Sequence, residues 1–358
     1  MKKLLLSLLI ASSSFVSAQV LQSDDFEGLN LGDIGTNLTG VTPGQGGWFT
    51  ANGAGGTNGS NSNYQIISLD GDPNGQSLQL TGSNAATGTR FMWKDGLIDS
   101  WAGRTQDNDI IEVEFDFNPL GASTSLNGFR VYIYSDDTPA LVLAGIGIAS
   151  NAVVNTVNYS NMVQGFGHWT STPGTGTYSF GLGATAATQI VLTENTWVRL
   201  GFSFNTVTGE IKWKGPDFNV TFNGNVNFPV ITAGKQPGEM DFVVAAGTGN
   251  VVADEALFDN FVMRASSTDT LLGTDEVVSR ANAFSVYPNP ANDFVKVSSY
   301  DYSINKVEMT DINGRVVKTI SNNSNEIQID LSDLSQGVYV MRITSSEGVS
   351  ATKKIVKQ

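Results

Sequence analysis

Short apolar runs that alternate with polar residues constrain this chain more than any other feature of its sequence. In the stretch 197–205, four apolar residues occupy alternate positions, namely Val198, Leu200, Phe202 and Phe204. Successive side chains of a strand point to opposite faces, so this segment has one apolar face. A turn that ends at Gly209 leads into a second run, 210–213. The pattern predicts a β-hairpin.

Similar runs recur at fairly even spacing through the first three quarters of the chain. They cover residues 77–80, 90–93, 110–117, 129–134, 141–148, 218–222 and 240–246. The 39 glycines provide turns between them, and the stretch 52–63 is too rich in Gly and Asn to form a strand. No segment shows a convincing amphipathic helical pattern. The sequence therefore predicts an all-β protein built as a sandwich.

Three segments of residues 20–265 resemble the concanavalin A-like, laminin-G-type jelly roll. They are the hairpin described above, the opening Asp-Asp-Phe-Glu at 24–27 and the closing Leu-Phe-Asp-Asn-Phe-Val-Met at 257–263. The resemblance implies two packed sheets whose first and last strands pair. It also implies a structural calcium ion near that seam and glycan binding on a concave face.

The tail, residues 284–358, has its own motifs. Tyr-Pro-Asn-Pro at 287–290 is followed by an Asn-Gly turn at 313–314, by Leu-Ser-Gln-Gly-Val-Tyr at 334–339 and by the basic end 353–357. Together these motifs resemble the type A C-terminal sorting domain of the type IX secretion system. The resemblance implies a small Ig-like sandwich of six or seven strands that directs export by the secretion machinery. It also implies removal of the tail, with the remaining protein attached to the cell surface or released.

Residues 1–18 have a basic start, an apolar run and a small-residue cleavage signal, which is typical of a secretory signal peptide. No later stretch is long and apolar enough to predict a transmembrane helix. The polar segment 266–283 is predicted to link the two sandwiches, and cleavage of the tail is expected within it. We therefore expect export through the periplasm to the cell surface or the medium.

The formal net charge of −14 disfavours nucleic acid as a partner, because phosphate backbones are repelled. Divalent cations and neutral glycans remain compatible with it. The absence of cysteine excludes a disulfide framework and cysteine-based zinc sites. The only histidine, His168, is expected in a glycine-rich loop as a contact residue or a simply exposed one.

Alternation along the strands also predicts ligand-binding residues. We expect the outer faces to carry aromatic and basic side chains, namely Arg130, Tyr132, Tyr134, Trp197 and Arg199. Aromatic rings stack on sugars, and charged groups bind paired hydroxyls. The sequence thus predicts binding of a glycan or an extracellular matrix component. An ordinary solvated face is the alternative.

Glu112, Glu114 and Asp116 are predicted to share one outward strand face. Neighbouring members would lie about 6.5–7 Å apart, within the range of inverting glycosidases. Jelly-roll glycosidases with a similar strand use Glu-x-Asp-x-x-Glu, and this chain has Phe117 where a third acid would be needed. We therefore interpret the three carboxylates first as a solvated face or a cation site. A glycoside hydrolase or lyase is the alternative function.

The predicted calcium ligands are Asp25, Glu27 and Asp259, with Asp24 as a further candidate. Asp259 shares its strand face with Leu257, Phe261 and Met263, so it would point toward the core unless the strand bulges. A buried carboxylate needs a partner. Oxygen ligands from the first strand would complete a calcium site, whereas an arginine or backbone donors would serve without metal.

The main functional prediction is a non-catalytic, exported binding or adhesion protein. The enzyme described above and a structural surface or biofilm protein without a small ligand are the alternatives.

Overall fold

The computed structural model describes residues 18–69, 75–185, 187–272, 284–299, 303–311, 315–345 and 350–358. The predicted signal peptide therefore lies outside the described residues, except for Ala18. The described residues form two separate apolar cores, one drawn from residues 26–265 and one from residues 284–355. Nearly all regular structure is β, as the sequence predicted.

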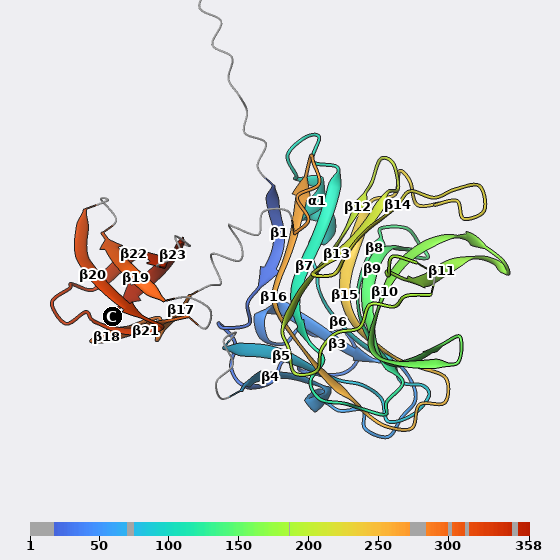
Figure 1. Ribbon diagram of the computed structural model, residues 1–358, viewed down its shortest axis with the longest axis horizontal. Coiled ribbons are helices and arrows are strands. Elements are labelled where there is room, and N and C mark those ends of the chain that lie inside the picture. Colours follow the sequence, from blue (N-terminus) through green and yellow to red (C-terminus); the bar gives the residue numbers. More distant parts are fainter. Residues whose placement is uncertain are drawn as a thin grey trace, which may run out of the picture.

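The larger unit consists of two packed sheets (Figure 1). The nine-stranded sheet has the order β14-β13-β12-β7-β16-β5-β4-β2, and β1 also pairs with β16. Its strands are β1 (Gln19–Asp24), β2 (Gly32–Asp33), β4 (Tyr64–Ser68), β5 (Gln76–Thr81), β7 (Ile110–Asn118), β12 (Val198–Asn205), β13 (Ile211–Gly215), β14 (Phe218–Phe222) and β16 (Glu255–Ser266). The pairing of β1 with β16 confirms the expected seam between the first and last strands.

The seven-stranded sheet has the order β11-β10-β9-β8-β15-β6-β3. Its strands are β3 (Trp48–Asn52), β6 (Arg90–Lys94), β8 (Asn127–Ser135), β9 (Val142–Val154), β10 (Val157–Ser171), β11 (Gly174–Gly181) and β15 (Pro237–Ala246). Non-consecutive neighbours in both sheets are typical of a jelly roll.

The core lies between the two sheets, and the predicted alternation is confirmed there. Val113 and Phe115 of β7, Phe202 of β12, and Val131 and Ile133 of β8 are all fully buried in it. Each sheet therefore also has an outer face, directed away from its partner sheet. The outer faces carry the residues predicted to have functional roles.

The second unit is a small sandwich of a three-stranded and a four-stranded sheet. Its strands are β17 (Ser285–Tyr287), β18 (Phe294–Ser298), β19 (Ile304–Thr310), β20 (Val316–Ser324), β21 (Glu326–Asp330), β22 (Gly337–Ser345) and β23 (Ser350–Lys357). β19 pairs with β20 as the arms of the predicted hairpin, while its Asn-Gly turn lies outside the described residues.

Helical structure is limited to short pieces. The described residues contain one α-helix, α1 (Leu97–Ala102), and the 3-10 turns η1 (Gln45–Gly47) and η2 (Asn61–Asn63). η2 ends the loop that follows β3, where the sequence predicted no strand. Within the part of the chain that is described, no helix is long and apolar enough to cross a membrane.

Candidate functional site

The five predicted ligand residues are divided between the two outer faces. Arg130, Tyr132 and Tyr134 belong to β8 in the seven-stranded sheet. Arg199 belongs to β12 in the nine-stranded sheet, and Trp197 immediately precedes that strand. Because the two outer faces point in opposite directions, the five residues cannot contact one ligand. The prediction of a single site was wrong, since alternation assigns a face to each residue but does not determine which sheet the strand joins.

Arg199 is already occupied by its own sheet. Its guanidinium forms ion pairs of 3.2 Å with Glu114 and 3.2 Å with Asp116, and it donates a hydrogen bond of 2.6 Å to the carbonyl oxygen of Asn260. These contacts join β12, β7 and β16 across the outer face. Arg199 therefore joins three strands of the sheet.

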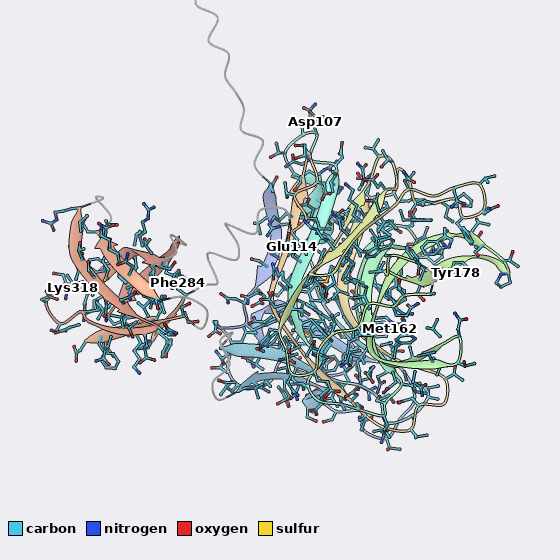
Figure 2. The ribbon with its side chains drawn as sticks, in the orientation of Figure 1. Asp107, Glu114, Met162, Tyr178, Phe284 and Lys318 are labelled. Carbon is cyan, nitrogen blue, oxygen red and sulfur yellow. The ribbon has the colours of Figure 1, made fainter. Side chains whose placement is uncertain are left out.

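Glu112 and Glu114 lie on the outer face but are not solvated. Glu112 is fully buried and Glu114 is 3% exposed. Figure 2 labels Glu114 on the jelly roll. Arg264 of β16 pairs with Glu114 at 2.9 Å. Burial raises the pKa of Glu114, but Arg264 and Arg199 outweigh it, so the pKa lies below its ordinary value. The interpretation as a solvated face was wrong, because the following segment of chain covers these side chains.

That segment, residues 267–272, is named the strap. It follows β16 and lies over β7, β12 and β13. Thr270 donates to Glu112 through its backbone N–H (2.5 Å) and its hydroxyl (2.6 Å), and Leu272 N–H donates to Glu114 (3.1 Å). Lys214 donates to the carbonyl oxygens of Leu271 and Leu272 at 3.1 and 2.9 Å.

The strap accounts for the beginning of the segment that was expected to be a linker. Ser266 is the last residue of β16 and donates to Glu112 at 2.9 Å, so it is part of the sheet. Leu271 is 3% exposed and lies against Gly201, where a Cβ would approach Leu271 Cδ1 to 2.8 Å. Residues 266–272 are therefore packed on the jelly roll. The remainder of the predicted linker, residues 273–283, lies outside the described residues.

Asp259 lies at a β-bulge, which the sequence left open as a possibility. The register of β16 against β7 shifts between Asp259 and Val262, and Asn260 has φ +47°. Phe258, on one side of the bulge, and Phe261, on the other, both lie in the core. The extra residue therefore places Asp259 on the outer face opposite Asp116, and the simple alternation that directed it to the core does not hold.

The environment of Asp259 is strongly acidic. Asp259 is fully buried and accepts hydrogen bonds from the backbone N–H (2.6 Å) and the side-chain amide (3.3 Å) of Asn260. Burial, together with the charges of Asp116, Glu27 and Asp25, raises the pKa of Asp259 to about 9. Asp259 is consequently protonated at neutral pH.

This arrangement fits the expected calcium ion only partly. Asp259 provides a buried oxygen, and the three neighbouring carboxylates are close enough to act on its charge. Among the described residues, however, no group of three or more acidic or histidine side chains converges as metal ligands. Asp24 is itself engaged by Lys94 at 2.7 Å and by Trp48 Nε1 at 2.8 Å. Calcium binding stays a prediction.

The outer face of the seven-stranded sheet has a different composition. The strand registers align one row of side chains across it: Phe49, Trp93, Asp241, Tyr132 and Phe166, on β3, β6, β15, β8 and β10. With strands about 4.8 Å apart, such a row extends across most of the sheet. Phe49 and Trp93 stack with ring centroids 5.6 Å apart, and Tyr132 meets Phe166 edge-on at 5.2 Å.

Two glycines of β9 leave room for these rings to lie close to the sheet. A Cβ on Gly145 would come within 2.3 Å of Tyr132 Cδ1, and one on Gly147 within 2.9 Å of both Arg130 Cγ and Phe166 Cε2. Tyr132 and Phe166 therefore form a buried floor together with Val142 and Val243.

Half-buried side chains surround this floor. They are Phe49, Phe91, Trp93, Arg130, Tyr134 and Glu239, and we call them the rim. Arg130 donates a hydrogen bond of 3.1 Å to the hydroxyl of Tyr132 and lies over Phe166, with its guanidinium carbon 5.0 Å from the ring centroid. Aromatic edges, a cation and a carboxyl group thus lie side by side on one face.

Glu239 and Asp241 are the acidic residues of this face that the sequence analysis missed, as it missed the rings of Phe49, Phe91, Trp93 and Phe166. They stand two residues apart on β15, and the intervening Met240 is in the core. Asp241 is 5% exposed and one of its side-chain oxygens, Oδ1, has no hydrogen-bond partner. Burial, the charge of Glu239 and a hydrogen bond to it raise the pKa of Asp241 well above its ordinary value. The alternation Glu-Met-Asp-Phe-Val-Val would have assigned both acids to the outer face.

His168 lies on β10 and not in a loop. Its ring is half-buried, and its Nδ1 is 3.3 Å from the hydroxyl of Thr177 on β11. Glycines 165 and 167, which suggested a loop, instead make room for core side chains, since a Cβ on Gly165 would meet Trp213 at 2.7 Å.

Comparisons with solved structures return matches of low similarity. Solved structures with a similar fold include Cellulose induced protein, Cip1 (15% identity, TM-score 0.41, covering 69% of this chain and 97% of that one). They also include LamAcat from Zobellia galactanivorans (12%, 0.39, 69% and 97%) and the CBM2 module of the evolved Dit of Lactobacillus casei BL23 phage J-1 (7%, 0.40, 71% and 98%). Similarity at this level carries no argument about function.

No curated protein matches the sequence. The tail does match a family model, because residues 285–358 fit the secretion system C-terminal sorting domain. This match agrees with the motifs of the tail and with its small sandwich. Residues 285–358 are therefore a C-terminal sorting domain of a secretion system, and a jelly-roll sandwich precedes it in the chain.

Proposed function

We propose that the protein is a non-catalytic glycan-binding protein that acts at the cell surface or in the medium. The rim of the seven-stranded sheet, Phe49, Phe91, Trp93, Arg130, Tyr134 and Glu239, would contact the ligand. Aromatic rings supply stacking surfaces for sugar rings, and the charged groups take paired hydroxyls.

One observation carries this proposal. The described residues place a row of four aromatic side chains and one carboxyl group across strands of a single outer face. The same face contains an unsatisfied buried oxygen, Asp241 Oδ1, which a ligand hydroxyl or a water molecule would satisfy. On the other outer face the strap covers Glu112 and Glu114, and Arg264 pairs with Glu114.

The arrangement of acids argues against a glycoside hydrolase. The two carboxyl groups of such an enzyme stand about 5–9.5 Å apart, so that the sugar or a water molecule fits between them. Glu239 and Asp241 are instead hydrogen-bonded to each other. Glu112 and Glu114 are buried and engaged by the strap and by Arg264, which leaves no room for a substrate.

The fate after export is also a proposal. We expect the sorting domain to be removed and the jelly roll to be attached to the surface or released. A cut before residue 273 would remove the strap and its donors to Glu112, so the exported protein should keep its sequence through Leu272. The mass of protein recovered from the cell surface tests this, because a full-length mass or one that ends before Leu272 contradicts it.

A glycan array with two tryptophan variants tests the binding proposal. Trp93→Ala removes a rim ring of the seven-stranded sheet, whereas Trp197→Ala removes a ring beside the opposite face. We expect Trp93→Ala to weaken glycan binding about tenfold and Trp197→Ala to leave it unchanged. The reverse result would move the site to the nine-stranded sheet. Absence of any glycan ligand would favour a structural surface protein.

A further inference from the structure

Carboxyl groups gather at and beside the rim. Glu239 stands half-buried above Asp241, and Asp95 follows β6 close enough for its charge to raise the pKa of Glu239. Tyr132 and Tyr134 of β8 face the same pair, and burial raises the pKa of both hydroxyls. Arg130, the cation of this face, is committed to the hydroxyl of Tyr132 and the ring of Phe166.

The two carboxyl groups of β15 act as one unit. Asp241 bonds to Glu239 through its side chain, while its own Oδ1 is buried and has no partner. Asp241 is too deep to be the first group that a ligand meets, whereas Glu239 is half-exposed at the rim. The hydrogen bond therefore lets Asp241 hold the Glu239 carboxylate in one orientation.

We propose that this rim binds the adjacent hydroxyls of a neutral glycan and excludes uronic acids, with Glu239 as the contact residue and Asp241 as its positioning residue. The inference rests on the proposed function. A fixed carboxylate accepts hydrogen bonds from two neighbouring hydroxyl groups. The carboxylate of a uronic acid would instead lie beside Glu239 and Asp95 in a partly buried site, where like charges repel more strongly than in water.

The pair also predicts how binding depends on pH. Burial comes first among the causes that raise the pKa of both Glu239 and Asp241. The raised pKa of Asp241 favours the form of the pair in which Asp241 is protonated and one negative charge remains. Alkaline pH removes that proton, and the two carboxylates then repel each other. Acid pH protonates Glu239 and removes the acceptor, so neutral-glycan affinity should peak between the two limits.

The experiment uses matched sugars that differ only in oxidation at C6. The mature full-length chain is tested by calorimetry against manno-oligosaccharides and oligomannuronates, and against cello-oligosaccharides and oligoglucuronates. We expect binding to the neutral member of at least one pair to be about tenfold or more tighter than to its uronic acid partner.

Two variants and a control separate the contact residue from the positioning residue. Glu239→Gln should weaken neutral-glycan binding about tenfold and narrow the discrimination against uronic acids. Asp241→Asn cannot ionise, so the fall in affinity at alkaline pH should disappear. Asp217→Asn changes an exposed carboxylate between β13 and β14 and should alter neither property. Circular dichroism at each pH confirms that every variant is folded.

Each outcome decides between the proposals. Tighter binding of uronic acids, or equal pH profiles for the wild type and Asp241→Asn, overturns this inference and leaves glycan binding intact. The proposed function itself is overturned if the wild type binds no member of the series and, like Trp93→Ala, binds no glycan on a broad array.

Discussion

The two outer faces of the jelly roll differ in how their polar groups are satisfied. On the nine-stranded sheet the strap donates hydrogen bonds to Glu112. Arg199 and Arg264 form ion pairs with Glu114. On the seven-stranded sheet no comparable segment of the described chain lies over the acids, and Asp241 Oδ1 lacks a partner. The two faces have similar residue types, but only the first is completed by its own chain, and we propose that the second binds a ligand.

The largest expected effect comes from a matched pair of arginines. Arg264→Ala leaves the buried Glu114 with Arg199 as its remaining side-chain cation, which should cost about 3 kcal/mol of unfolding free energy. Arg130→Ala removes a half-buried cation over Phe166 and should cost about 1 kcal/mol or less. Urea unfolding measures both. Equal losses of unfolding free energy in the two variants would contradict the difference between the two faces.

Asp259→Asn tests the buried acid at the bulge. Because the pKa of Asp259 is about 9, the folded protein keeps a proton that the unfolded chain releases. Below the ordinary pKa of aspartate, the folded protein has the full stability of its protonated form. As the pH rises from there to about 9, the unfolding free energy falls by about 1.4 kcal/mol per pH unit. The variant should therefore be more stable than the wild type at pH 7, with a gain that grows toward pH 9. Parallel stability curves between pH 5 and pH 9 would refute this.

Two glycine substitutions compare the packing on the two faces. Gly201→Ala places a Cβ against Leu271 and should loosen the strap at a cost of about 1–3 kcal/mol, with no change in glycan binding. Gly145→Ala places a Cβ against Tyr132 and should weaken glycan binding as well as stability. Hydrogen exchange of residues 267–272 and calorimetry distinguish them. Loss of glycan binding in Gly201→Ala but not in Gly145→Ala would contradict the assignment of the binding site to the seven-stranded sheet.

Calcium is expected to have the smallest effect. Binding near Asp259 would displace its proton, so added calcium should raise the melting midpoint by a few degrees, and more so at higher pH. A chelator should reverse the shift, and Asp259→Asn should abolish it. An unchanged midpoint with calcium and with chelator would show that the prediction of calcium is wrong.

Much of the fold follows from local pattern. Alternation in the segments that became β7, β8 and β12 correctly assigned their core side chains, because the two-residue period of a strand is independent of its partners. The motifs of the tail were equally local, and the family match at residues 285–358 confirms them. The acids of β15 were within reach of the same reasoning.

The candidate site depended on non-local features. One extra residue at Asn260 moved Asp259 to the other face, and such a bulge leaves no clear mark in the pattern. The position of the strap over Glu112 also required contacts between segments more than 150 residues apart.

The sequence alone thus determined that the chain is all-β, which side chains of β7, β8 and β12 are buried, and that its tail is a secretion sorting domain. Only the tertiary structure decided which strands share a sheet, which outer face is covered, and which carboxylates are paired. The physical reason is that side-chain direction along a strand is set by local backbone geometry. Sheet order, register and coverage, in contrast, depend on contacts between distant segments, whose energies no single segment contains.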